Sequence, residues 1–194
     1  MLDRRGETAA LPAIREKLRT GESQVKAVAA VAAARMGGPD TWDDIVPLFA
    51  SGDPAEIRAA KTAVSFFASD ALIPRMAALL PHTPPAAQVA LLDVLADRKA
   101  MSQSAAILSL SLSPEESVRM AALTALEQTV TAADLPVLAE RLIAAEVPAE
   151  IVLIQNAAAA AARQIPDREE AAVPLLEALG RASGSKRVDL IRPL

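Results

Sequence analysis

An aliphatic residue followed by proline recurs along the chain, and the spacing of these pairs constrains the fold more than any other feature. The pairs are Leu11-Pro12, Val46-Pro47, Ile73-Pro74, Leu135-Pro136 and Val173-Pro174. The third interval is about twice the others, and Ala105 stands midway in it, where another proline would fall. A period between about 20 and 50 residues is the signature of a repeat protein. The sequence therefore predicts an array of structural repeats.

A second marker has a similar spacing. Each repeat contains a turn followed by a β-branched residue, here called the anchor, and the anchors are Val25, Ile57, Val89, Val118, Ile151 and Val188. Successive anchors are 29 to 37 residues apart. Two unrelated markers with one spacing indicate five full repeats and a truncated sixth. The linkers are short throughout, so we expect residues 1–194 to form a single repeat domain.

Each repeat is expected to consist of two helices, A and B, with the proline in the first turn of helix A. In the second repeat, helix A contains Ile45 and Phe49, the segment Ser51 to Pro54 interrupts it, and helix B follows. The predicted inward positions of that helix B are Ile57, Ala60, Val64 and Phe67. In the fourth repeat we expect Ser113 to cap helix B, with Glu116 three residues later. The expected inward positions there are Val118, Ala121, Ala122 and Ala125.

The composition agrees with helices. Hydrophobic residues make up 52% of the chain and aromatic residues only 2%, so alanine and aliphatic side chains must form the core. Alanine is the strongest helix former, whereas a β-sandwich of this size would carry more β-branched and aromatic residues at alternating positions.

The segment Asp53 to Ala60, read as aspartate, proline and then aliphatic-Arg-x-Ala, resembles the HEAT repeat, and Ser113 to Ala122 is similar. The resemblance implies an all-α fold, a right-handed α-solenoid of about five and a half HEAT-like helix-turn-helix repeats. The period resembles that of the shorter bacterial HEAT-like units. Tetratricopeptide repeats require large aromatics at fixed positions, and this chain has no tyrosine.

Catalytic, metal-binding and cofactor-binding groups are scarce. The chain has no cysteine and one histidine, His82, which lies in a proline-rich turn where a solvated loop residue is expected. The formal net charge is −4 and no segment concentrates lysine and arginine, so we expect no nucleic-acid partner. No apolar stretch approaches the roughly 20 residues that span a bilayer. We therefore expect a soluble protein without catalytic residues, metal or cofactor, cytoplasmic by default.

One region offers an alternative function. HEAT-like folds also include DNA glycosylases and bilin lyases, which use aromatic and carboxylate groups in a cleft. In this chain Trp42 with Asp43 or Asp44 is the only candidate for such an enzyme or nucleic-acid-acting module. The competing interpretation is that Trp42 packs at the start of helix A of the second repeat, with both aspartates favoured by the positive end of that helix.

The candidate binding surface lies on the B helices, which line the concave side of a HEAT-like fold. The position four residues after each anchor forms a column, in which Lys61 and Asp93 could pair and Gln155 could bond between layers. The column has two interpretations, contacts between repeats or a groove of mixed polarity that accepts a protein or peptide. The groove would contain Arg58, Lys61, Ser65, Asp93, Asp97 and Arg119. On the second interpretation the chain is a non-catalytic protein–protein interaction scaffold.

The two ends of the array lack a convincing polar capping repeat. We therefore expect the chain to be part of a longer repeat protein. We also expect Val188, Leu190 or Ile191 to be exposed and to promote weak end-to-end self-association.

Overall fold

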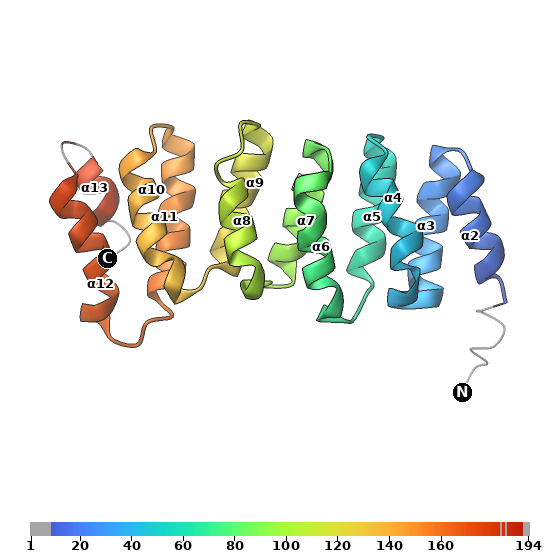
Figure 1. Ribbon diagram of the computed structural model, residues 1–194, viewed down its shortest axis with the longest axis horizontal. Helices are drawn as coiled ribbons and strands as arrows, with labels where there is room; N and C mark the ends of the chain where they lie inside the picture. Colours follow the sequence, from blue (N-terminus) through green and yellow to red (C-terminus); the bar gives the residue numbers. More distant parts are fainter. Residues whose placement is uncertain (1–8, 183, 185, 192–194) are drawn as a thin grey trace. The chain divides into compact units, whose positions relative to one another are not determined.

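The computed structural model describes residues 9–182, 184 and 186–191, and every regular element within them is a helix (Figure 1). The all-α prediction is confirmed. The helices form two compact units that divide between Val94 and Leu95. This division falls inside one helix, α7 (Pro85–Asp97), and each unit is described by itself below.

The first unit contains helices that pack as pairs, like the predicted A and B helices. Helix α2 lies beside α3, α4 lies beside α5, and the two B helices α3 and α5 pack against each other. Short 3₁₀ turns precede α4 and α6 and follow α6. The bounds are α2 (Leu11–Thr20), α3 (Ser23–Gly37), η1 (Gly38–Thr41), α4 (Trp42–Ala50), α5 (Pro54–Ser65), η2 (Asp70–Leu72), α6 (Ile73–Leu79) and η3 (Leu80–His82), followed by α7.

The second unit repeats this arrangement. Helix α8 packs on α9 and α10 on α11, while the B helices α9 and α11 contact each other and the A helices α10 and α12 do the same. The bounds are η4 (Met101–Gln103), α8 (Ser104–Leu110), α9 (Glu116–Thr129), η5 (Ala132–Asp134), α10 (Leu135–Ala144), α11 (Pro148–Ala162), α12 (Arg168–Arg181) and α13 (Lys186–Ile191). Helix α8 occupies the predicted repeat whose proline is replaced by Ala105.

Helix α5 shows how the local sequence determines a helix in this chain. The Asp53 carboxylate accepts a hydrogen bond from the backbone amide of Ala55 at 2.7 Å, and Pro54 occupies the first helical position, where its missing N–H is not needed. The predicted inward residues are all buried, which confirms the register of this helix: Ile57, Ala60, Val64 and Phe67. In the fourth repeat Val118, Ala122 and Ala125 are buried as expected, and Ala121 is half-buried.

Two details of the helix starts differ from the sequence predictions. Ser113 does not cap α9, which begins three residues later at Glu116, because the Arg119 guanidinium holds the carbonyls of Ser113 and Pro114. Two of the prolines, Pro47 and Pro174, lie inside helices α4 and α12 and not in their first turns. For α12 the reason is Asp167, whose carboxylate caps the helix well before its proline.

The core is built largely from alanine. In α11 the residues Ala157, Ala158, Ala160 and Ala161 are buried, and α3 has a similar buried alanine face. Small side chains allow neighbouring helix pairs, here called layers, to approach closely. Larger aliphatic and aromatic side chains, such as Phe49 and Phe67, fill the remaining spaces between helices. Among the described residues no helix is long and apolar enough to cross a membrane.

Candidate functional site

The predicted pair in the polar column is present. The Lys61 Nζ on α5 donates a hydrogen bond of 2.7 Å to the Asp93 Oδ2 on α7, and both side chains are partly exposed. The two residues occupy the same position in successive repeats, so the contact joins neighbouring layers. The predicted pairing of Lys61 with Asp93 is confirmed.

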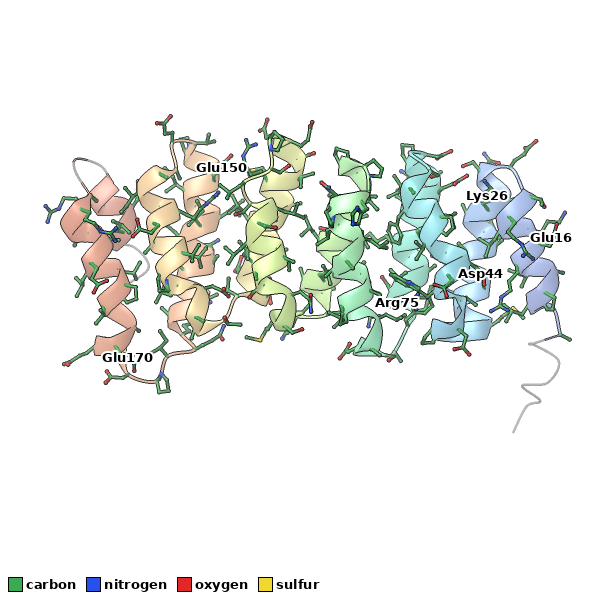
Figure 2. The ribbon with its side chains drawn as sticks, viewed as in Figure 1. Glu16, Lys26, Asp44, Arg75, Glu150 and Glu170 are labelled. Carbon is green, nitrogen blue, oxygen red and sulfur yellow. The ribbon has the colours of Figure 1, made fainter. Side chains whose placement is uncertain are left out.

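A second column of ion pairs was not predicted. In each case a basic residue directly after one anchor meets a glutamate directly before the next anchor. Lys26 lies 3.6 Å from Glu56 in the first unit, and the Arg119 Nε donates to Glu150 at 2.8 Å in the second. Figure 2 shows Lys26 near the start of α3. The recurrence of glutamate immediately before Ile57 and Ile151 was the sequence signal that could have revealed this column.

Other polar side chains bond to the backbone of a neighbouring layer. The Gln155 amide donates to the Asp189 carbonyl at 3.0 Å, which confirms its expected role between layers. Arg141 donates to the Ser111 carbonyl at 2.6 Å. Burial lowers the pKa of the Arg141 guanidinium, the nearby Glu150 carboxylate opposes that effect, and the Arg119 charge adds to it. These bonds satisfy helix-end carbonyls that would otherwise lack partners.

The six residues of the predicted groove are divided between the two units, and several of them have partners within their own unit. Lys61 and Asp93 are paired with each other, and the Ser65 hydroxyl donates to the Lys61 carbonyl of its own helix. Arg58 is exposed on α5 in the same unit. The other two lie in the second unit: Asp97 is exposed at the end of α7, and Arg119 is engaged with Glu150. Most of the charge in this set therefore serves contacts between layers. Arg192, at the last column position, lies outside the described residues.

The Trp42 region has the geometry of packing. Trp42 begins α4 as expected and is only 3% exposed. The Arg75 guanidinium lies 5.5 Å from the centre of the Trp42 ring and forms an ion pair with Asp43, while Asp44 is paired with Arg15 at 2.8 Å. Figure 2 labels Asp44 and Arg75 in this region. Both carboxylates are thus held in ion pairs near a buried ring, and this geometry gives the alternative enzymatic or nucleic-acid function no support.

The single histidine lies where the sequence places it. His82 is exposed in the short 3₁₀ turn between α6 and α7. In the part of the chain that the structure describes, no group of three or more histidine, cysteine, aspartate or glutamate side chains could hold a metal ion.

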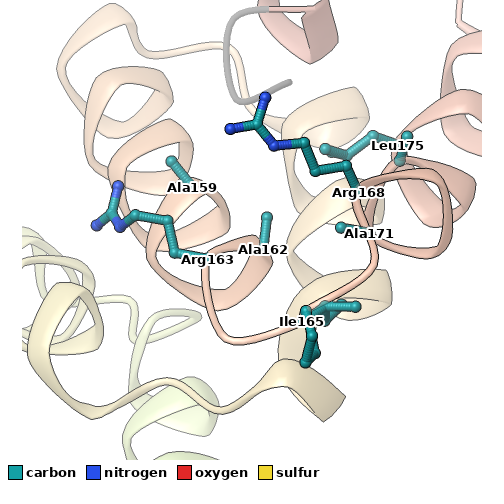
Figure 3. Close-up of a pocket in the computed structure, with 9 residues that line it drawn as sticks. Ala159, Ala162, Arg163, Ile165, Arg168, Ala171 and Leu175 are labelled. Carbon is teal, nitrogen blue, oxygen red and sulfur yellow. The ribbon is translucent and has the colours of Figure 1, made fainter.

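A pocket of about 500 Å³ lies between the end of α11 and the start of α12 (Figure 3). Its walls are mainly the small side chains of Ala159, Ala162 and Ala171, with Leu175 from α12 and Ile165 from the connecting loop. Helix α12 packs chiefly against α10 and α13, and this arrangement leaves a space beside the last turn of α11. No pattern in the sequence predicted this pocket.

Two arginines border the pocket from opposite sides, Arg163 at the end of α11 and Arg168 at the start of α12 (Figure 3). Both side chains are exposed, and neither has an ion pair or hydrogen-bond partner among the residues that the structure describes. Arg119, Arg141 and Arg181 of the same unit are all engaged with carboxylates or carbonyls. The pocket therefore combines small and aliphatic side chains with two arginines that have no ion-pair partner among the described residues.

Comparisons of the chain with protein-family models, curated proteins and solved structures found no match in any of the three. No family membership and no relative's activity therefore indicates what this chain binds. Its own side chains carry the functional argument.

Proposed function

We propose that this chain is a HEAT-like α-solenoid and serves as a non-catalytic protein-binding scaffold. Three features support this proposal. The helices pack as A and B pairs, the polar contacts between layers join residues one repeat apart, and Asp53 with Pro54 begins helix B as the HEAT pattern requires. Repeat arrays of this kind present extended surfaces to protein partners.

The pocket between α11 and α12 is the proposed binding site. Binding pockets are typically concave, and a few polar or charged groups in them fix the orientation of the ligand. The observation that carries the proposal is the pair of uncompensated arginines, Arg163 and Arg168, at an alanine-lined pocket. Arginine suits carboxylates because its planar guanidinium can donate two parallel hydrogen bonds. The expected ligand is a peptide segment with one aliphatic side chain flanked by aspartate or glutamate.

The polar column is a weaker candidate for the same role. Lys61, Asp93 and Arg119 already have partners within the chain, so a ligand would have to displace an ion pair before binding. Arg163 and Arg168 require no such exchange. We therefore assign the column to contacts between repeats and the pocket to recognition.

The experiment is a peptide-display selection against the purified chain, followed by affinity measurements on the best selected peptide. We expect the Arg163→Ala, Arg168→Ala double variant to weaken binding by roughly tenfold or more, about 1.4 kcal/mol. Arg19→Ala removes an exposed arginine of an ordinary surface pair and should leave the affinity unchanged.

A triple variant with alanine at Lys61, Asp93 and Arg119 separates the two candidate surfaces. We expect its peptide affinity to equal that of the wild type once circular dichroism has shown that it remains folded. A loss of affinity confined to this triple variant would restore the predicted groove. Failure to select any carboxylate-containing peptide would contradict the pocket proposal.

A further inference from the structure

A second concave surface lies on the first helix pair, far from the pocket in sequence. A groove of about 530 Å³ runs between α2 and α3 and is lined almost entirely by apolar atoms. Val25 and Val28 lie in it, and Val28 is 73% exposed. The polar residues that border it are Lys17 and Gln24.

Equivalent positions in the other repeats indicate what the α2–α3 groove is suited to contact. Val25 and Val28 correspond to Ile57 and Ala60 on α5, counted from the anchor. Ile57 is 3% exposed and Ala60 is fully buried, in a helix that packs against the preceding B helix α3. In the second unit Ile154, which holds the same position as Val28, is also fully buried on α11, which packs against α9. These positions contact the preceding layer.

The two polar residues of the groove also have equivalents in later repeats. Lys17 lies five residues after its proline, as Arg141 does, and Arg141 reaches back to the Ser111 carbonyl of the preceding A-helix layer. Gln24 lies directly before its anchor, as Glu150 does, and Glu150 accepts from the basic residue of the preceding layer. The α2–α3 groove is therefore a surface for receiving a preceding helix pair. No described residue of this chain covers Val28.

The α12–α13 pair has a surface at positions that, in an earlier repeat, are covered by the following helix pair. Val173 and Leu176 correspond to Leu135 and Leu138 of α10, counted from the proline. Both α10 residues are fully buried in a helix that α12 packs against, whereas Leu176 is 52% exposed. Val188 and Ile191 of α13 are exposed as the sequence predicted, but Leu190 is buried, because it turns inward on the opposite side of this short helix.

The two surfaces are complementary in size and charge. The groove has small residues such as Ala13 and Ala32 together with the exposed Lys17. The α12–α13 surface has large aliphatic side chains together with the exposed Glu177. In this chain, layers that contact each other are regularly joined by one basic and one acidic or carbonyl group.

We propose that the α2–α3 groove binds the α12–α13 surface of a second copy of this chain. The contact continues the packing between layers from one molecule to the next. Because two different surfaces meet, each added copy leaves one surface of each kind open, and association is not limited to a dimer.

Two surface variants test this head-to-tail arrangement. Val28→Glu places a charge in the groove and Leu176→Glu places one on the opposite surface, and both side chains are exposed, so each variant should fold. By sedimentation velocity, we expect the wild type to form larger species as its concentration rises. Each variant alone should remain monomeric, because every contact needs both surfaces.

A mixture of the two variants gives the decisive result. The intact groove of Leu176→Glu and the intact α12–α13 surface of Val28→Glu can form one contact only, so we expect a single heterodimer. Val137→Glu, a matched control at an exposed residue of α10, should associate like the wild type. The proposal is overturned if the wild type stays monomeric at every concentration, if the mixture stays monomeric, or if Leu176→Glu alone dimerises through two grooves.

Discussion

At the scale of single residues, charged side chains mainly join one helix pair to the next. Asp53 has two such roles, because it caps one helix and also bonds to the preceding repeat. Its carboxylate caps α5 and accepts a hydrogen bond of 2.6 Å from the Ser23 hydroxyl of the preceding repeat. The Ser23 bond is the largest cause that lowers the pKa of Asp53, followed by the bond from the Ala55 amide.

This lowered pKa predicts a pH-dependent effect. Since the folded state favours the ionised carboxylate, its contribution is fully present above the unfolded pKa of about 3.9 and is lost as the pH falls through the lower folded pKa. We expect Asp53→Asn to lower the midpoint of thermal unfolding at pH 7 and the difference from wild type to shrink towards pH 3. Glu127→Gln, at an exposed carboxylate, should show no such trend. A difference that persists unchanged at pH 3 would contradict this account.

The pair of Arg119 and Glu150 predicts a measurable coupling. Glu150 is buried and Arg119 is mostly so, and the guanidinium also holds two carbonyls. In a double-mutant cycle by chemical denaturation, we expect a coupling of about 1.5 kcal/mol for this pair. The exposed pair of Arg19 and Glu16 should give about 0.3 kcal/mol. Equal coupling energies for the two pairs would show that the contact between layers stabilises the fold no more than an exposed surface pair does.

At the scale of helices, the sequence predicted where helices occur better than where they begin. The period of aliphatic-proline pairs and anchors placed α5, α8 and α10 correctly, because helix existence follows from apolar periodicity and from local turn residues. The predicted start of α9 was wrong. The carbonyls before this helix are bound by a long side chain, that of Arg119. Such a contact leaves no periodic signal.

The alanine faces predict intolerance to larger side chains. Ala158 is fully buried on α11, in a helix that packs against both α9 and α10. We expect Ala158→Leu to lower the free energy of unfolding by about 1–3 kcal/mol, because the added atoms must separate closely packed layers. Ala144→Leu, at an exposed position in the last turn of α10, should change it by less than about 0.5 kcal/mol. Equal effects in chemical denaturation would argue against close packing of the layers.

At the scale of the whole molecule, the charged residues that join neighbouring layers differ from the two arginines of the proposed binding pocket. The pairing of Lys61 with Asp93 was predictable, because equivalent positions in successive repeats lie near each other. The pocket was not predictable, because it arises where α12 leaves the last turn of α11 uncovered. The sequence contained one signal only, two arginines flanking the short loop with Ile165 and Pro166.

The location of a bound peptide tests the central claim most directly. With isoleucine, leucine and valine methyl groups labelled for NMR, the display-selected peptide should shift the resonances of Ile165 and Leu175, which line the pocket. We expect the methyl groups of Ile57 and Leu92, on the helices that carry Lys61 and Asp93, to be unaffected. Shifts at Ile57 and Leu92 with none at Ile165 and Leu175 would contradict the account and place recognition on the polar column.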